Sequence, residues 1–174
     1  MGDVDRLWAP WRGTFLAQRG RRACIFCAAK RSRLDERALV VARGREVFAI
    51  LNRYPYTNGH VMVAPYRHVG DLQALSADAW AEMLEVTQRL MACLREIIRA
   101  QGFNIGLNVG QVAGAGIPGH LHLHVVPRWR GDVNYMSVIG ETRVISQSLE
   151  EVYRRITPWM RNTTSTRPRH RSGA

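Results

Sequence analysis

The stretch "GIPGHLHLHVVPRW" at residues 116–129 carries histidines at alternate positions, namely His120, His122 and His124. The whole chain has 6 histidines, so half of them lie within this one stretch. Alternate residues of a β-strand point to one face, and the residues between them point to the other face. The pattern therefore predicts a strand over residues 120–126, ended by the next proline, with three imidazoles on one face and apolar side chains in a core.

Two kinds of chemistry would use three imidazoles on one face. Neutral imidazoles bind zinc, and three of them can form a catalytic site with an open position. Alternatively, one imidazole can attack phosphorus while its neighbours orient it and donate protons. The glycine-rich loop over residues 110–119 favours a phosphate, because its backbone N–H groups can bind phosphate oxygens. It is not a Walker loop, since no Gly-Lys-Ser/Thr follows.

The composition is that of one globular domain. The chain has 174 residues, of which 46% are hydrophobic. No apolar run reaches the about 18 residues that a membrane helix needs, and the N-terminal "MGDVDRLWAPWRG" lacks the apolar segment of a secretory signal. The 3 cysteines do not suggest a disulfide framework. We therefore expect a cytoplasmic protein that does not bind membranes.

The net charge of +11 is unevenly distributed. Residues 12–37 hold 8 basic and 2 acidic residues, and the tail after residue 162 adds 3 arginines. The rest of the chain is close to balanced, which argues against a dedicated nucleic-acid partner. A basic field that attracts a small polyanion, such as a nucleotide, is the favoured interpretation.

Three regions follow from the pattern along the chain. Residues 1–37 form an N-terminal arm that contains a Cys-x-x-Cys pair and an aromatic "LWAPWR" segment. The favoured interpretation of this segment is an anchor that packs on the domain or on a partner subunit, and the alternative is a ring that covers a bound base. Residues 38–161 form the main domain, which contains the three alternating histidines. Residues 162–174 lack aliphatic side chains and are predicted to be a disordered basic tail.

The domain itself is predicted to be α+β with a mainly antiparallel sheet. Two strands over residues 38–52 turn at 43–45, and further strands cover 59–65 and 103–109. One long helix has Ser76 as its N-cap, an apolar stripe to Ile98, and Gly102 as its stop. Residues 141–161 give a mixed strand and helix signal that ends near Pro158. Cys93 falls on the apolar stripe and is predicted to be inert core, and His170 is predicted to be a solvated tail residue.

The pair Cys24 and Cys27 is open to several interpretations. It could be a redox pair, two buried thiols, or half of a tetrahedral zinc site, which needs two further ligands. The spacing alone does not decide among these.

Several motifs together resemble a known family. His-φ-His-φ-His-φ-φ at residues 120–126, followed by Pro127-Arg128, is similar to the signature of the histidine triad family. The resemblance extends to "CIFC" at 24–27, "GHVMVAPYRHV" at 59–69 and "GFNIGLNVG" at 102–110. It covers about residues 24 to 130. The flanking "RLWAPWR" and "PRWRGDVNYMSVIGETRV" resemble the bacterial branch of diadenosine tetraphosphate phosphorylases and related hydrolases.

The resemblance implies a fold and a set of functional residues. The fold is a five-stranded antiparallel sheet with one long helix and short flanking helices, the sheet being extended across a homodimer. His122 would be the nucleophile, with its other ring nitrogen held by a backbone carbonyl, and His124 would contact phosphate. The implied catalytic residues are His122, His124, His120 and His60. The implied nucleotide contacts are Asn52, Asn108, Gly114 and Gly116.

The resemblance also implies a structural zinc and one departure from the family. Zinc-bearing members place its ligands at positions that correspond here to Cys24, Cys27, His68 and His120, and catalysis itself requires no cofactor. Many members carry Ser, Gln or Thr just before the triad, where the side chain reaches the phosphate. Here residues 115–119 offer no side-chain donor, so backbone amides would take over that role.

The implied function is cleavage of a dinucleoside polyphosphate, such as diadenosine tetraphosphate, at an α-phosphate. A nucleotidyl-histidine intermediate would be resolved by phosphate or by water, and the sequence leaves that choice open. Alternatives are a hydrolase of nucleoside phosphoramidates or mononucleotide conjugates, a zinc hydrolase with the three histidines as ligands, and a non-catalytic nucleotide-binding module. The zinc hydrolase lacks a nearby Asp or Glu in the strand, and His120 also fits the other metal site.

Overall fold

The computed structural model describes residues 24–132 and 147–162. In these parts, one antiparallel sheet has the strand order β1-β2-β3-β5-β4. The five strands are β1 (Val40–Arg43), β2 (Val47–Leu51), β3 (Val61–Pro65), β4 (Gly102–Leu107) and β5 (Leu123–Arg128). The helices are α2 (Ile25–Arg31), α3 (Asp35–Ala38), the 3₁₀ turn η1 (Leu72–Ala74), α4 (Ala77–Ile98) and α6 (Leu149–Asn162). The predicted α+β class with a five-stranded antiparallel sheet and one long helix is confirmed.

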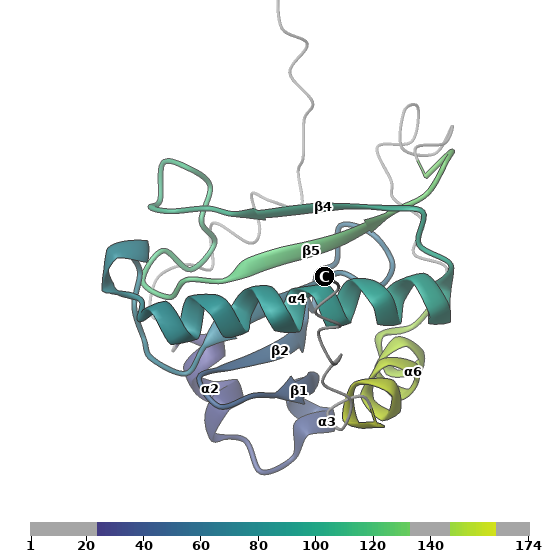
Figure 1. Ribbon diagram of the computed structural model, residues 1–174, viewed down its shortest axis with the longest axis horizontal. Coiled ribbons are helices and arrows are strands. Elements are labelled where there is room, and N and C mark those ends of the chain that lie inside the picture. The colour runs from purple at the N-terminus through teal and green to yellow at the C-terminus, as the bar shows by residue number, and fades with distance from the viewer. Residues whose placement is uncertain (1–23, 133–146, 163–174) are drawn as a thin grey trace, which may run out of the picture.

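The core lies between the sheet and α4. Figure 1 shows α4 running along one face of the sheet, with α6 and α3 near β1. Every residue of β2 and β3 is buried, which explains why these two short strands are continuously apolar. The α4 helix carries its apolar stripe towards the sheet, and α6 packs against both α4 and β1. The largest fully buried apolar side chains include Phe26, Phe48, Leu51, Met83, Leu90, Leu94, Ile156 and Met160.

The long helix begins as predicted and ends earlier. Ser76 Oγ accepts a hydrogen bond from Ala79 N at 3.3 Å, so the predicted N-cap is confirmed. The prediction that Gly102 ends the helix is wrong, because Arg99 adopts the left-handed conformation with φ 56°. There the backbone N–H of Arg99 and that of Ala100 both bond to Leu94 O, which satisfies the helix end without glycine. Gly102 is instead the first residue of β4.

The triad strand is shorter at its start than predicted. β5 begins at Leu123, because its pairing with β3 starts at Val63↔Leu123. His120 precedes the ladder and closes a turn, with its N–H bonded to Ile117 O at 3.2 Å. Pro127 does not end the strand as predicted. Pro127 pairs with Phe103 of β4. On the other edge of β5, pairing with β3 ends at Val125, so no N–H of residue 127 is needed there for a strand-to-strand hydrogen bond.

The structure describes only part of each terminal region. The described part of the arm contains α2 and the first residues of α3, for which the sequence analysis made no prediction. The mixed signal before residue 162 resolves into α6, which continues past Pro158 to Asn162. The "LWAPWR" segment, residues 133–146 and the basic tail with His170 lie outside the described residues. The three domain boundaries stay a prediction. Among the described helices, none combines the length and the apolar character needed to cross a membrane.

A glycine just before β3 is required by both conformation and space. Gly59 has φ +74°, and a Cβ there would lie 2.7 Å from Ile98 Cδ1. We expect Gly59→Ala to lower the free energy of unfolding by about 2 to 4 kcal/mol, because strain and overpacking add. Chemical denaturation measures this change. Gly102→Ala is the matched control, since its Cβ would meet only Arg128 Cβ at 3.9 Å, and we expect a change within about 0.5 kcal/mol. Equal losses in the two variants would contradict this account.

Candidate active site

Five of the six histidines gather in two adjoining clusters around β3 and the start of β5. The first, called the imidazole cluster below, consists of His60, His122 and His124. The register Met62↔His124 brings the start of β3, where His60 lies, beside β5. His122 immediately precedes β5, and its ring centroid is 4.8 Å from that of His124. The second cluster contains His68 and His120 with the two cysteines.

His122 presents one ring nitrogen as a free base. Its Nδ1 lies 2.8 Å from His120 O, and a carbonyl oxygen can only accept. Nδ1 therefore carries the proton and donates it, which leaves the lone pair on Nε2. Burial lowers the pKa of His122 and so favours the neutral ring. The backbone-carbonyl contact implied by the family resemblance is present, and it gives His122 the tautomer that a nucleophile needs.

A chain of hydrogen bonds assigns the tautomers of the other two rings. Tyr56 N lies 3.2 Å from His60 Nδ1, and a backbone N–H can only donate, so His60 Nδ1 accepts. His60 Nε2 therefore carries the proton and donates it to His124 Nδ1 at 2.9 Å. His124 consequently holds its own proton on Nε2. The imidazole cluster thus offers one nitrogen base, on His122, and one N–H donor, on His124.

Burial keeps these rings neutral. It lowers the pKa of His60 to about 3, with the nearby His124 and His122 adding to the effect. Burial, together with His122, lowers the pKa of His124 to about 4. Both groups are therefore uncharged near neutral pH, and the hydrogen-bond chain described above persists there.

The same pKa shifts make stability depend on pH. Below the unfolded pKa of 6.5, the unfolded chain binds protons on His60 and His124 that the folded chain does not bind. The contribution of these two histidines to the free energy of unfolding is therefore fully present above pH 6.5 and is lost as the pH falls towards 4. We expect each histidine to remove about 2 kcal/mol at pH 5 relative to pH 8. Denaturation at both pH values tests this, and His60→Gln should remove about half of the loss; equal stability at pH 5 and pH 8 would contradict it.

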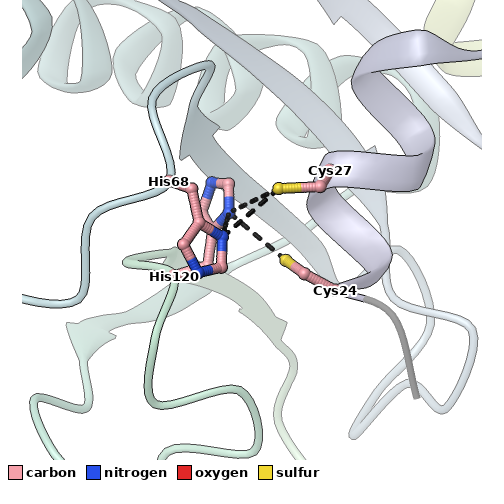
Figure 2. A group of neighbouring side chains, drawn as sticks. All are labelled: Cys24, Cys27, His68 and His120. Atoms are coloured by element: carbon pink, nitrogen blue, oxygen red, sulfur yellow. Dashed lines mark hydrogen bonds between the residues drawn. The ribbon is translucent and has the colours of Figure 1, made fainter. Parts of the chain in front are cut away.

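The second cluster, called the Cys/His cluster below, joins three separate segments. Cys24 and Cys27 come from α2, His68 follows β3, and His120 precedes β5 (Figure 2). Cys24 Sγ lies 3.3 Å from His120 Nδ1, and Cys27 Sγ lies 3.2 Å from His68 Nδ1. The two Nδ1 atoms are 3.2 Å apart, and all four ligand atoms lie within 4.8 Å of one another. The four residues predicted to lie together therefore do so.

The chemistry of the donor set fits a tetrahedral cation. Ligands about 2.0 to 2.3 Å from zinc stand about 3.3 to 3.8 Å apart in a tetrahedron, close to the separations seen here. His120 Nε2 donates to Pro65 O at 2.8 Å, so its Nδ1 faces the cysteines with a free lone pair. Burial lowers the pKa of His120 to about 4 and raises that of the Cys24 thiol. The ring is thus ready as a ligand, and a cation would supply the charge that a buried thiolate requires.

This arrangement does not support a catalytic zinc held by all three triad histidines. The two ring nitrogens of His120 face Pro65 O and the cysteines, whereas His122 Nδ1 faces His120 O. The rings therefore cannot converge on one cation. Within residues 24–132 and 147–162, the Cys/His cluster is the group of His, Cys, Asp and Glu ligand atoms close enough to hold a metal.

The predicted nucleotide-contact residues differ in how closely they approach the imidazole cluster. Asn52 is adjacent to it: Oδ1 accepts from Tyr54 N at 2.9 Å, which turns Nδ2 towards His60 Nδ1 at 3.3 Å. Asn108 reaches across the glycine-rich loop, where its Nδ2 donates to Gly114 O at 3.4 Å. Gly114 has φ +88° and allows the loop to turn there. No contact places Gly116 at the histidines, so its role remains a prediction.

Two aromatic side chains at the site were missed by the sequence analysis. The Tyr56 ring centroid lies 4.7 Å from that of His60 and 6.0 Å from that of His124. The Phe26 centroid lies 5.0 Å from that of His120 and 4.8 Å from that of His122. The one signal for Phe26 was its place inside "CIFC". Cys93 is buried and its pKa is raised to about 12 by burial, which confirms it as inert core.

The fold and these clusters define a class of protein that the comparisons confirm. Residues 33–131 match the HIT domain, so the chain belongs to the HIT (histidine triad) family. It is 41% identical over 168 residues to AP-4-A phosphorylase of Mycobacterium tuberculosis, an alignment that covers 91% of this chain and 86% of that protein. The family resemblance drawn from the sequence is therefore confirmed.

Solved structures agree with this assignment. The chain is similar to a zinc-bound histidine triad family protein from Mycobacterium smegmatis, with 29% identity, a TM-score of 0.65, and coverage of 82% of this chain and 96% of that one. It is also similar to a hypothetical histidine triad nucleotide-binding protein from Sulfolobus tokodaii, with 26% identity, a TM-score of 0.65, and coverage of 80% and 93%.

Proposed function

We propose that this chain is an enzyme that cleaves dinucleoside polyphosphates, such as diadenosine tetraphosphate, at an α-phosphate by phosphorolysis. The observation that carries the proposal is the His122 tautomer: Nδ1 is held by His120 O, and Nε2 is left as a free base beside the His124 N–H. The choice of phosphate over water is supported by the relative from M. tuberculosis that is named AP-4-A phosphorylase.

In the first step, His122 Nε2 attacks the α-phosphorus. A P–N bond forms as the bond from that phosphorus to the bridging oxygen breaks, and ATP leaves with the bonding pair. Positive charge develops on the imidazole, and the Nδ1–H bond to His120 O stabilises it. The His124 Nε2–H, oriented by His60, donates to the phosphate oxygens on which negative charge develops.

In the second step, inorganic phosphate attacks the nucleotidyl-histidine. The new P–O bond forms as the P–N bond breaks, so ADP leaves and His122 regains its free Nε2. Attack by water would give AMP instead, and the residues of the imidazole cluster would act identically in either case. The first half of the reaction therefore depends on this chain's histidines, and the second half depends on which acceptor is bound.

Substrate contacts complete the proposal. Asn52 would contact the ribose beside His60, and Asn108 with the Gly114 and Gly116 loop would contact phosphate. The loop lacks a side-chain donor over residues 115–119, so backbone N–H groups would bind the phosphate oxygens.

A structural zinc ion belongs to the proposal as well. Cys24, Cys27, His68 and His120 would hold it, and the bound ion would cross-link α2 to the two loops that flank β3 and β5. Zinc takes no part in the reaction. The paired cysteines must stay reduced to act as ligands, which favours the cytoplasm as the working compartment.

A homodimer is proposed on the basis of β4. This strand is at the edge of the sheet, and Ile105 at its centre is 45% exposed. Pairing of β4 with its copy in a second chain would cover this edge and extend the sheet across the dimer.

A product assay tests the reaction. The protein is incubated with diadenosine tetraphosphate, with and without inorganic phosphate, and nucleotides are separated by chromatography. If ADP and ATP form in the presence of phosphate, and no products form in its absence, the result supports phosphorolysis. If AMP and ATP form without phosphate, the reaction is hydrolysis and not phosphorolysis. No turnover on this substrate, combined with turnover of nucleoside phosphoramidates, would overturn the proposed substrate class.

A further inference from the structure

Phe26 links the Cys/His cluster to the imidazole cluster. It lies on α2 between Cys24 and Cys27, and its side chain is fully buried. Its ring meets the His120 ring at a tilt of 41° and the His122 ring at a tilt of 35°, with centroids 5.0 and 4.8 Å apart. A phenyl ring donates and accepts no conventional hydrogen bond, so what it supplies to His122 is shape.

The His122 imidazole needs such a contact to hold its direction. The bond from Nδ1 to His120 O fixes one point of the ring but leaves the ring free to swing about it. The His124 ring approaches at 69°, close to edge-on. Phe26 supplies a second contact, and together these neighbours restrict the direction in which the Nε2 lone pair points. Nucleophilic attack is sensitive to this direction, because small misplacements lower the rate steeply.

The position of Phe26 depends in turn on how α2 is anchored. α2 has 7 residues and no side-chain N-cap, so it has little stability of its own. Its cysteines face His68 and His120, Lys30 Nζ donates to Tyr66 O at 2.8 Å, and Arg43 donates to Ala29 O at 3.1 Å. These contacts hold α2 against the sheet at the place where Phe26 meets the nucleophile.

We propose that Phe26 is a positioning residue that sets the direction of the His122 imidazole. This inference rests on the proposed function of His122. Phe26 is fully buried and acts by restricting the ring of the residue that carries the attacking nitrogen.

The test compares two buried phenylalanines. Phe26→Leu removes the ring beside His122. Phe48→Leu makes the same change in an equally buried residue whose ring stacks on Tyr66 at 5.3 Å. We expect Phe26→Leu to lower kcat about 10- to 100-fold with KM changed less than threefold, whereas Phe48→Leu leaves kcat within about threefold. Phe26→Met, which has nearly the same volume as leucine and also lacks a ring, should behave as Phe26→Leu does.

A readout that needs no turnover separates this proposal from the proposed function. The ¹⁵N spectrum of the His122 ring in wild type should show one protonated and one bare nitrogen. In Phe26→Leu the two ¹⁵N signals should move towards each other as the tautomers mix. In Phe48→Leu the two signals should keep their wild-type chemical shifts. Equal kcat and equal ¹⁵N signals in the two leucine variants would overturn the positioning role alone. Loss of the proposed function would appear instead as full turnover in His122→Ala.

Discussion

Replacing His122 with alanine is expected to lower kcat for diadenosine tetraphosphate by about 10⁴-fold or more. The reaction proposed here passes through a bond to His122 Nε2, and alanine offers no atom that can form it. His124, oriented by His60, remains in place and still donates to phosphate oxygens, so substrate binding should weaken far less than turnover. Rapid-quench kinetics give the rate, and isothermal titration calorimetry gives the binding constant.

The variant should fold, which keeps this result interpretable. Losing the bond to His120 O and the buried imidazole ring is expected to cost about 1 to 3 kcal/mol of stability. Thr87→Ala is a matched control, because Thr87 is also a buried polar residue and donates to Met83 O far from the histidines. We expect it to lose similar stability and to keep full activity. Retention of more than about 1% of wild-type kcat in His122→Ala would reject His122 as the nucleophile.

Removal of the proposed zinc ion is expected to lower the melting temperature by about 10 °C or more. The Cys/His cluster joins α2 to the segments after β3 and before β5, so losing the ion frees three parts of the chain at once. A loss of about 3 to 5 kcal/mol corresponds to this shift for a protein of this size. A strong chelator followed by a thermal melt measures it, and elemental analysis of the untreated protein gives the zinc content.

Cysteine variants supply the controls for that measurement. Cys27→Ser should melt early without chelator and respond little to it, since the ligand set is already broken. Cys93→Ala should respond to the chelator as wild type does, because Cys93 is buried in α4 away from the cluster. Native protein without stoichiometric zinc, whose melting temperature is unchanged by the chelator, would contradict the assignment.

The site was predictable from the sequence to the extent that its residues are chemically rare. Histidine is uncommon in this chain, so three at alternate positions stood out, and the motif resemblance supplied His60, His68 and the cysteine pair. Alternation over residues 120–126 correctly predicted that Leu121, Leu123 and Val125 are buried, but His120 and His122 are buried as well. It could not show that pairing with β3 begins at Leu123, because hydrogen-bond partners across a sheet are set by a distant segment.

The features that were missed depend on tertiary contacts. Gly102 satisfied a helix-stop rule, yet Arg99 ends the helix because two backbone N–H groups reach Leu94 O. Phe26 and Tyr56 are ordinary aromatic residues in the sequence, and their importance comes from the rings beside them. The tautomers of the histidines follow from individual hydrogen bonds to Pro65 O, His120 O and Tyr56 N, which no pattern of residue types encodes.

The most direct test of this account is to trap the intermediate. The protein is mixed with diadenosine tetraphosphate without inorganic phosphate, denatured at alkaline pH to preserve a P–N bond, digested and analysed by mass spectrometry. We expect the peptide that contains His122 to carry one adenylyl group on that residue, and the adduct to vanish when phosphate is added before denaturation. An adduct on any other residue, or turnover with no adduct during single-turnover sampling, would contradict catalysis through His122.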